Sequence, residues 1–314
     1  MLPNFLKCLF LASTFIVTVT FAEAKDSSCE ALFHPAGEIS SVLSFDFLDR
    51  EFSRVPNDEK RGLVTEAVPV SKESLLAGYA KGLFPFETTA DGSGRWFDPP
   101  ERGIMILSEI KIGKSDLKDI KKLLAQVKAG ELRITEDQAF GRVIRECKAQ
   151  ERLRRDAVSH ELIEKESWIS DHIVAGYEAM FASGHAHSVE IWRGAELVGG
   201  LYGSHVNGVF SGESMFHKES NVTKLAFWYS LKTLAARGFK WVDTQVAVPA
   251  APSTEPGKSS SVSLTVKWGA HEVSRDSVYR PMLREAQNVN LPWKTLDREI
   301  VEREILRGLE SEGP

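Results

Sequence analysis

The chain has 314 residues, of which 42% are hydrophobic and 26% charged, and its formal net charge is -5. A chain of this length and composition has enough apolar material for one large core or two smaller ones, so a globular protein is the expectation and disorder is not the default. The acidic balance argues against nucleic-acid binding driven by overall charge, although local clusters of Lys and Arg can still hold a phosphate backbone.

The N-terminal segment has the pattern of an export signal. Lys7 precedes an apolar run from Leu9 to Phe21, and residues 22–24 (Ala-Glu-Ala) have the small-x-small pattern of a signal-peptidase site. The apolar run is shorter than the roughly 20 residues that a spanning helix needs. We therefore expect residues 1–24 to be a cleaved signal peptide, with membrane contact only through that peptide. An uncleaved anchor and a misassigned start codon are the alternatives.

After cleavage the mature chain keeps two cysteines, Cys29 and Cys147. In the periplasm or outside the cell they could form one disulfide, but the sequence does not show whether their positions allow it. Neither cysteine has the spacing of a metal ligand, and Cys147 is most simply a residue that packs a helix against its neighbours.

Residues 25–62 mix Gly, Pro, Ser and charged residues with a few apolar ones, and we expect a partly ordered lead-in segment. Residues 63–166 alternate helix signals with short extended pieces, including a strand at 133–135 and a helix from Asp137 to Lys148. This interval is predicted to be a small N-terminal α/β domain.

Two basic clusters fall within this N-terminal domain, and the first lies on a segment with the apolar spacing of an amphipathic helix. For either cluster, a solvated helix face is about as good an explanation as a nucleic-acid contact. The first cluster comprises Lys111, Lys114, Lys118, Lys121, Lys122 and Lys128, and the second comprises Arg142, Arg145, Lys148, Arg152, Arg154 and Arg155.

Residues 167–286 have the element order of a mixed sheet with helices packed on it. A helix from Asp171 to Ser183 is followed by three strands, by a helix between Ser220 and Gly238, and by a strand around Asp243. The three strands are expected at 187–193, 196–205 and 208–216. Residues 287–314 form a C-terminal extension with a charged helix candidate from Asp297 to Leu309.

The strand around Asp243 carries the most informative pattern. Side chains alternate along a strand, so Asp243 and Gln245 point to one face together. If the strand that contains Glu213 packs beside it, three polar side chains meet near the sheet. From the residues alone, a buried Asp–Gln hydrogen bond between strands is about twice as good an explanation as a catalytic pair. For Glu213, a salt bridge, for example to Lys224, is about as good an explanation as a functional role.

Four motifs, in consistent order, resemble the leucyl/phenylalanyl-tRNA–protein transferase family from about Leu63 to Arg284. They are the upstream block at 79–86 and 96–103 with Ser167-Trp168-Ile169, the segments 185–192 and 196–203, Gly212-Glu213-Ser214-Met215-Phe216, and Asp243-Thr244-Gln245-Val246. The resemblance implies an α/β (α+β) fold in which the C-terminal domain is acetyltransferase-like (GNAT-like) with a mixed sheet.

The resemblance also implies an activity: transfer of Leu, Phe or Met from aminoacyl-tRNA to the N-terminal Lys or Arg amine of an acceptor protein, as in the N-degron pathway. The partners would be the 3′ end of aminoacyl-tRNA and acceptor proteins with basic N-termini, and the basic clusters would contact tRNA. Because aminoacyl-tRNA is already an activated ester, the reaction needs positioning and oxyanion stabilisation, and we expect no metal or other cofactor.

Individual roles follow from the same resemblance. Asp243 and Gln245 would be the catalytic hydrogen-bonded pair, with the Gln oxygen receiving the attacking α-amine and the Asp polarising it. Glu213 would recognise the basic residue of the acceptor. The other substrate-binding residues would be the aromatic ones at the 3′-terminal adenosine, Tyr79, Phe86 and Trp168, and those near the pocket for the transferred side chain, Met215 and Ser214.

His185 and His187 are a conceivable metal pair, but no third ligand is suggested by spacing, and imidazoles satisfied at a helix-to-strand turn are about four times as good an explanation. Ser188 and Ser214 lack the nucleophile elbow that a catalytic serine needs.

The chain departs from the family pattern in five places. Residues 67–70 replace a Gly-Gly-Asp-Leu-like segment, Phe86 and Phe97 stand where Trp is usual, two intervals are lengthened, and a leader is present. The leader predicts a periplasmic or secreted protein, whereas a cytoplasmic location is usual for the family. The alternatives are therefore an exported acyltransferase-like protein with a different donor, or an inactive binder of basic N-termini.

Overall fold

The computed structural model describes residues 44–150, 153–155, 162–164, 167–246 and 263–296. These described residues belong to one compact unit. The predicted signal peptide, the Cys29 half of the hypothetical disulfide and the Asp297–Leu309 helix candidate lie outside the described residues.

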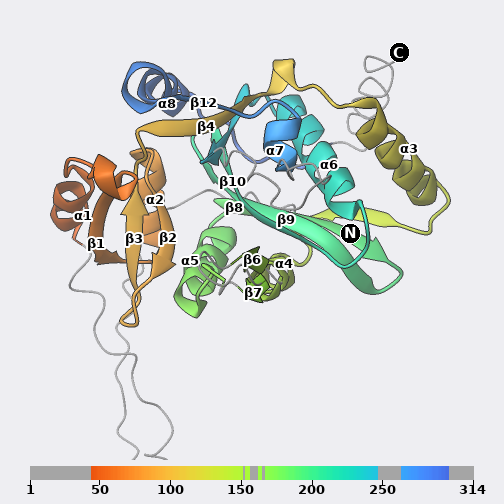
Figure 1. The fold of residues 1–314 in the computed structure, drawn as a ribbon, viewed down its shortest axis with the longest axis horizontal. Coiled ribbons are helices and arrows are strands. Elements are labelled where there is room, and N and C mark those ends of the chain that lie inside the picture. The colour runs from red at the N-terminus through yellow and green to blue at the C-terminus, as the bar shows by residue number, and fades with distance from the viewer. Residues whose placement is uncertain (1–43, 151–152, 156–161, 165–166, 247–262, 297–314) are drawn as a thin grey trace, which may run out of the picture. The chain divides into compact units, whose positions relative to one another are not determined.

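A seven-stranded mixed sheet forms the centre of this unit, with the order β12-β4-β11-β10-β9-β8-β5 (Figure 1). All neighbouring strands are antiparallel except β10 and β11, which run parallel. A parallel pair needs a crossover connection, and α6 (Val222–Ala236) supplies it. The predicted α/β class with a mixed sheet is therefore confirmed. The strands are β4 (Glu101–Ile106), β5 (Arg133–Glu136), β8 (Ala186–Arg193), β9 (Glu196–Val206), β10 (Val209–His217), β11 (Trp241–Gln245) and β12 (His271–Ser274).

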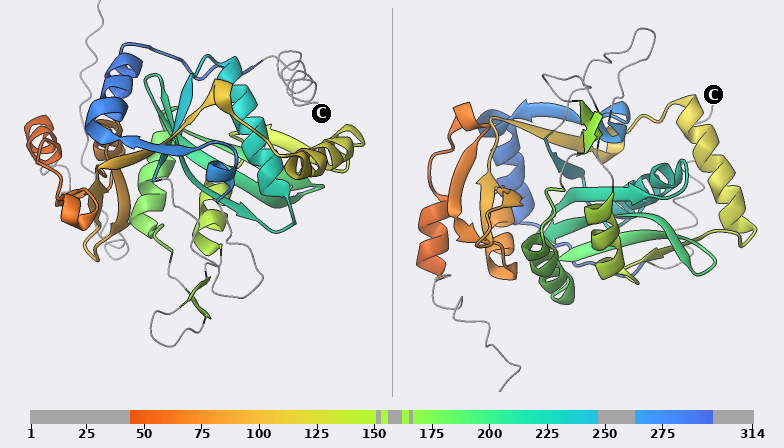
Figure 2. Two further views of the ribbon diagram at one scale, coloured as in Figure 1. Left: turned by 45° about the horizontal axis from the view of Figure 1, so that its top comes forward. Right: turned by 60° about the horizontal axis from the view of Figure 1, so that its bottom comes forward.

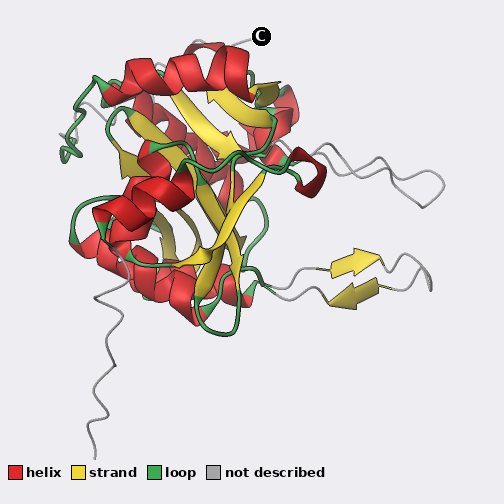
Figure 3. Cartoon of the chain, turned by 90° about the vertical axis from the view of Figure 1, so that its left-hand side faces the viewer, coloured by secondary structure: helices red, strands yellow, loops and turns green. Residues whose placement is uncertain are grey.

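Helices cover both faces of the sheet (Figures 2 and 3). On one face, α6 and α3 (Lys114–Lys128) pack on a core that contains Leu201 and Phe210. On the other face, α4 (Phe140–Ala149) and α5 (Asp171–Ala182) pack on a core that contains Tyr202 and Phe216. Leu201 and Tyr202 are neighbours on β9, so the two cores follow from the alternation of side chains along one strand.

A second, three-stranded antiparallel sheet has the order β1-β3-β2. It is formed by β1 (Leu63–Pro69), β2 (Phe84–Thr88) and β3 (Ser93–Phe97), with α1 (Phe45–Phe52) and α2 (Lys72–Ala80) beside it. Trp96 is fully buried at its centre, and its indole nitrogen donates a hydrogen bond to the Val68 carbonyl at 2.9 Å. The same core continues onto the face of the main sheet that α4 and α5 cover.

The remaining described elements are short. They are η1 (Asp58–Lys60), η2 (Leu107–Glu109), β6 (Leu153–Arg155), β7 (Leu162–Glu164), α7 (Leu264–Lys267), the π-type turn η3 (Arg275–Tyr279) and α8 (Arg280–Gln287). None of the helices in the described part of the chain is long and apolar enough to cross a membrane.

The structure differs from the sequence-based outline in two places. The boundary expected near residue 166 runs through a continuous sheet, because β4 and β5 precede it while β8 to β11 follow it. The helix expected from Asp137 begins only at Phe140. Asp137 instead has a positive φ of 57° and uses its carboxylate to accept hydrogen bonds from the Ser188 backbone and the His187 ring.

Helix α2 is tied closely to the small sheet through a glycine. A Cβ on Gly78 would lie 2.5 Å from Cζ3 of Trp96, so only glycine allows this approach. We expect Gly78→Ala to lower the free energy of unfolding by about 1–3 kcal/mol, because the added methyl group overpacks a closed core. Urea unfolding measures the loss. Gly113→Ala is the matched control, because no atom lies within 4 Å of its added Cβ; equal losses in the two variants would contradict the close contact.

Candidate active site

Polar side chains gather where β10 and β11 run side by side. Ser211 on β10 is paired in register with Asp243 on β11. Two residues further along β10, the pairing with β9 shifts between Gly212 and Ser214, which makes Glu213 the extra residue of a β-bulge. A bulge changes the direction of a side chain, and the Glu213 carboxylate contacts residues of α2 and β9 on the face that α5 covers.

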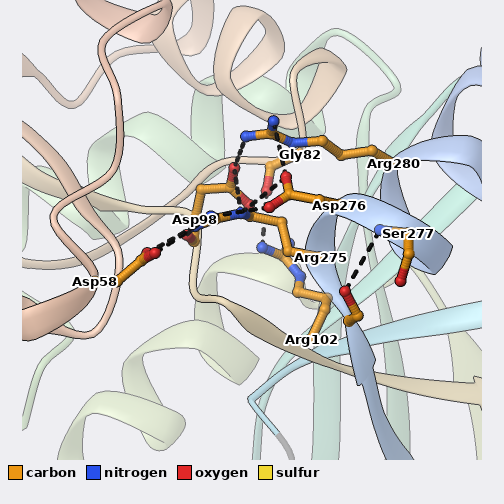
Figure 4. Close-up of polar contacts among 9 residues, drawn as sticks. Asp58, Gly82, Asp98, Arg102, Arg275, Asp276, Ser277 and Arg280 are labelled. Atoms are coloured by element: carbon orange, nitrogen blue, oxygen red, sulfur yellow. Dashed lines mark hydrogen bonds and ion pairs between the residues drawn. The ribbon is translucent and has the colours of Figure 1, made fainter.

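Asp243 forms a buried ion pair with Arg102 on the neighbouring strand β4. Arg102 Nε donates to Asp243 Oδ1 at 2.9 Å and Nη2 donates to Oδ2 at 2.6 Å, with side-chain exposures of 0% and 1%. The third contact of the guanidinium, from Nη1, is to the Gly82 carbonyl at 2.7 Å, and Figure 4 shows Arg102 beside Gly82. Burial lowers the pKa of Arg102, but the charge and hydrogen bonds of Asp243, together with Tyr279 and Asp98, raise it overall.

Aromatic rings and two more donors complete the surroundings of this ion pair. The Arg102 guanidinium carbon lies 4.6 Å from the centre of the Phe84 ring and 4.5 Å from that of Tyr279. The Tyr279 hydroxyl donates to Asp243 Oδ2 at 2.8 Å, and the Gln245 backbone N–H donates to Oδ1 at 2.7 Å. The two oxygens of Asp243 therefore accept four hydrogen bonds, which use its acceptor capacity fully.

A second charged network surrounds Arg275 and Arg280, at either end of the segment that contains Tyr279 (Figure 4). Arg280 donates to Asp98 Oδ2 at 2.6 Å, while Arg275 donates to the Asp98 carbonyl at 2.9 Å and to Asp58 Oδ1 at 2.8 Å. Burial raises the pKa of Asp98, although the neighbouring arginines lower it. These contacts join the segment around Tyr279 to the small sheet.

Glu213 is held by three neutral donors. Tyr79 and Ser204 donate to Oε1 at 2.6 and 3.2 Å, and the Gln245 side-chain nitrogen donates to Oε2 at 2.8 Å. Within the described part of the chain, no cationic side chain forms an ion pair with Glu213. The hypothetical salt bridge to Lys224 is wrong, because Lys224 pairs with Asp116 and Asp119.

The missing counter-charge has an electrostatic consequence. Burial raises the pKa of Glu213 to about 7, although the hydrogen bonds from Tyr79 and Gln245 lower it. Burial also raises the pKa of Tyr79 and Tyr177 well above its usual value, so both hydroxyl groups keep their protons. The Tyr79 hydroxyl contacts that of Tyr177 on α5 as well as Glu213.

Gln245 links the two carboxylates. Its φ is 64°, a left-handed conformation that is uncommon outside glycine, and the pairing of β11 with β4 shifts between Asp243 and Gln245. The predicted Asp–Gln pair is present, but it is made by the Gln245 backbone rather than its side chain. The side-chain nitrogen bonds Glu213 instead, and no described residue donates a hydrogen bond to Gln245 Oε1.

The aromatic residues predicted to bind the adenosine do not all occupy similar environments. Phe86 and Trp168 are half-buried and stack at 5.3 Å with an angle of 16°. Tyr79, by contrast, is only 5% exposed, so its ring has almost no free face for a base. The stacking role predicted for Tyr79 does not fit this burial, whereas its hydroxyl bonds Glu213 directly.

The residues predicted for the pocket of the transferred side chain lie on β10. Ser214 on β10 is paired with Tyr202 on β9, and Met215 packs against the core beneath α6. Met215 is thus on the opposite face of the sheet from the Glu213 contacts, because side chains alternate after the bulge. A single pocket containing Met215 and the Glu213 carboxylate does not fit this arrangement.

The histidines have protein partners. His187 bonds Asp137 through Nδ1 at 2.8 Å and stacks on Trp293 at 3.6 Å, while His185 Nδ1 lies 3.1 Å from the His205 carbonyl. Among the described residues there is no group of three or more His, Cys, Asp or Glu side chains that could hold a metal ion.

Sequence reasoning missed two residues of the site. Arg102 lies in the Trp96–Gly103 motif, but nothing in a linear motif shows that its partner is Asp243. Tyr177 stands in the apolar pattern of α5, where a phenol in a core position usually needs a hydrogen-bond partner. That need was the only available signal.

Comparison with known proteins gives one consistent result. The sequence model described as Leucyl/phenylalanyl-tRNA protein transferase matches residues 104–254. Leucyl/phenylalanyl-tRNA–protein transferase of Shewanella sp. strain W3-18-1 is 36% identical over 213 residues, which cover 66% of this chain and 83% of that protein. The protein of the same name from Afipia carboxidovorans is 38% identical over 180 residues, which cover 57% and 72% of the two chains.

A solved structure, that of L-PGS from Bacillus licheniformis, covers 62% of this chain and 66% of its own. It is 8% identical with a TM-score of 0.33, which is too low to support any argument. The acetyltransferase-like assignment of the C-terminal region stays a prediction.

The buried ion pair generates a stability prediction. Arg102→Met should lower the free energy of unfolding by about 3–5 kcal/mol, because it leaves Asp243 buried without a counter-charge. The double variant Arg102→Met/Asp243→Asn should lose less than the sum of the single losses, as a double-mutant cycle in urea would measure. Arg193→Met is the control, since it breaks a half-exposed pair with Glu219; a loss as large as that of Arg102→Met would contradict this account.

The raised pKa of Glu213 generates a pH prediction. Between its unfolded pKa of 4.5 and its folded pKa of about 7, the folded chain binds more protons than the unfolded chain. The stability that Glu213 contributes therefore falls as pH rises through this range, by on the order of 3 kcal/mol. Unfolding in urea from about pH 5 to 8 should show that Glu213→Gln removes this decline.

Glu219→Gln is the matched control for the pH prediction, because Arg193 lowers the pKa of Glu219. Glu219→Gln should therefore leave the fall in stability between about pH 5 and 8 in place. A decline that persists unchanged in Glu213→Gln would contradict the assignment.

Proposed function

Because this chain belongs to the leucyl/phenylalanyl-tRNA–protein transferase family, we propose that it transfers an amino acid from aminoacyl-tRNA to the N-terminus of an acceptor protein. The observation that carries the proposal is the Glu213–Gln245 pair. It combines a carboxylate that has no described cationic partner with an amide oxygen that no described residue occupies. A carboxylate and an acceptor oxygen side by side suit a cationic or amine-bearing substrate.

The chemistry requires little more than positioning. The ester of aminoacyl-tRNA is already activated, so the protein has to hold the ester near the attacking α-amine and orient the lone pair of that amine. Gln245 Oε1 would accept a hydrogen bond from the amine, and Asp243 would fix Gln245 through its backbone N–H. Glu213 would supply negative charge for an acceptor that begins with Lys or Arg.

The donor side of the site is supported by two features. The stacked pair Phe86–Trp168 is half-buried and would hold the 3′-terminal adenosine, with stacking worth about 1–3 kcal/mol per base. The lysines of α3 are exposed, and no described acidic residue forms an ion pair with any of them, so they remain available for phosphates. They are Lys114, Lys118, Lys121, Lys122 and Lys128. Transfer of Leu or Phe is the donor preference that the family name suggests.

The second basic cluster, which begins at Arg142, is less suited to binding tRNA than the lysines of α3. Arg145 pairs with Glu178 and Lys148 pairs with Asp171, so part of its charge is neutralised within the protein. We therefore assign the main electrostatic contact with tRNA to α3.

The leader favours a second candidate function. If residues 1–24 direct export, the same site would use another activated acyl donor, because charged tRNA is a cytoplasmic substrate. Both candidates share the acceptor side of the site at Glu213 and Gln245, and they differ in the donor that supports transfer.

The test is transfer of radiolabelled Leu or Phe from charged tRNA to a protein with N-terminal Arg, using the full-length chain. Gln245→Ala should lower the rate at least about 100-fold, because it removes the acceptor oxygen from the amine and a donor from Glu213. Gln138→Ala, between β5 and α4, is the matched control and should keep wild-type activity, since its side chain is exposed and accepts one hydrogen bond, from Arg133, among the described residues. Folded wild-type protein that transfers neither amino acid would favour the second candidate.

A further inference from the structure

The two carboxylates of the site have opposite surroundings. We propose that Glu213 accepts the proton of the attacking α-amine, while Asp243 is a positioning residue that never takes part in proton transfer. The inference rests on the proposed function, because it concerns the same site and the same reaction.

Asp243 has no free capacity for a proton. Its two oxygens already accept four hydrogen bonds, two of them from the Arg102 guanidinium. At 1% exposure, the carboxylate is also closed to solvent and to substrate. A proton on Asp243 would have to displace Arg102 or Tyr279, which would leave a buried charge or hydroxyl without a partner. Asp243 therefore acts through Gln245, whose backbone it holds.

Glu213 has the capacity that Asp243 lacks. Its three hydrogen bonds come from neutral groups, and no positive charge among the described residues is paired with its carboxylate. The titratable groups around it are Tyr79 from α2, Tyr177 from α5 and Asp243 from β11; the Arg102 charge beside them is already paired with Asp243. Burial raises the pKa of Glu213 to about 7, near the pH at which a general base works best.

The position of Gln245 brings the amine to Glu213. The side-chain nitrogen of Gln245 donates to Glu213 Oε2 at 2.8 Å. The nitrogen and oxygen of the amide share one carbon atom, so an amine that donates a hydrogen bond to the side of Gln245 Oε1 nearer Nε2 would lie near the Glu213 carboxylate. Oε1 of Glu213 accepts from Tyr79 and Ser204, whereas Oε2 accepts only from Gln245 among the described residues, so Oε2 would receive the amine proton.

The step balances with groups already named. The neutral α-amine attacks the carbonyl carbon of the aminoacyl ester, and a C–N bond forms. One amine proton passes to the Glu213 carboxylate, which becomes a carboxylic acid. The C–O bond to the ribose of tRNA breaks, and the proton passes from Glu213 to the departing ribose oxygen. The products are a peptide bond and a free 3′ hydroxyl group, and Glu213 returns to its charged form.

The experiment compares full-length wild-type protein with Glu213→Gln in single-turnover transfer from about pH 6 to 8.5. Two acceptors are used, one with N-terminal Arg and one with N-terminal Ala. The wild-type rate should rise with pH through an apparent pKa near 7. In Glu213→Gln this acid limb should disappear, and kcat should fall about 100-fold or more for both acceptors. KM should rise only for the Arg acceptor, because the negative charge that faces its basic side chain is lost. Only the titration of the acceptor amine, near pH 8, should remain.

The alternative role of Glu213 gives a different result. If Glu213 only recognises a basic side chain, Glu213→Gln should raise KM for the Arg acceptor alone and keep kcat, and this outcome would overturn the proposal. Wild-type protein that transfers to neither acceptor would instead refute the proposed function.

A second variant keeps the proposal testable if Glu213→Gln does not fold. Tyr79→Phe removes a hydrogen bond that lowers the pKa of Glu213, so the acid limb should move to higher pH. A limb that stays in place in a folded Tyr79→Phe protein would count against Glu213 as the titrating group.

Discussion

The ion pair between Arg102 and Asp243 is the interaction on which the site depends. A single guanidinium joins β4 to β11 and, through the Gly82 carbonyl, joins both strands to the segment that follows α2. Burying two charges is costly unless both are paired and hydrogen-bonded, and every polar atom of the Asp243 carboxylate has a partner. The geometry of Gln245 follows, because its backbone N–H is one of those partners.

The division of charge between Asp243 and Glu213 explains why two carboxylates can lie near each other on one sheet. Asp243 is neutralised by a permanent counter-ion, whereas Glu213 is surrounded by hydroxyl and amide groups. Environments that push two similar groups toward different protonation behaviour are typical of acid–base sites. Here the difference comes from one residue, Arg102, which contacts only one of the two acids.

The sequence predicted which side chains form the site better than it predicted the residues that hold them in place. Alternation along a strand placed Asp243 and Gln245 together, and the neighbouring strand brought Glu213 to them. The bulge that directs Glu213 and the positive φ of Gln245 leave no mark in a periodic pattern, so the partner of each side chain could not be derived. The role of Arg102 could not be predicted for a different reason. Its strand comes early in the chain but pairs with β11, and the expected domain boundary separated the two.

The long sequence separation of the central contact also has a consequence for how the protein is made. Arg102 precedes Asp243 by 141 residues, and Tyr279 follows Asp243 by another 36. During synthesis from the N-terminus, Arg102 on β4 is made before β11, which carries its counter-ion Asp243. Tyr279, whose hydroxyl also binds Asp243, is made later still. The small sheet is complete by Phe97 and needs only local pairings. Contacts of high sequence separation form slowly, so the centre of the molecule becomes ordered only when nearly all of the chain has been synthesised.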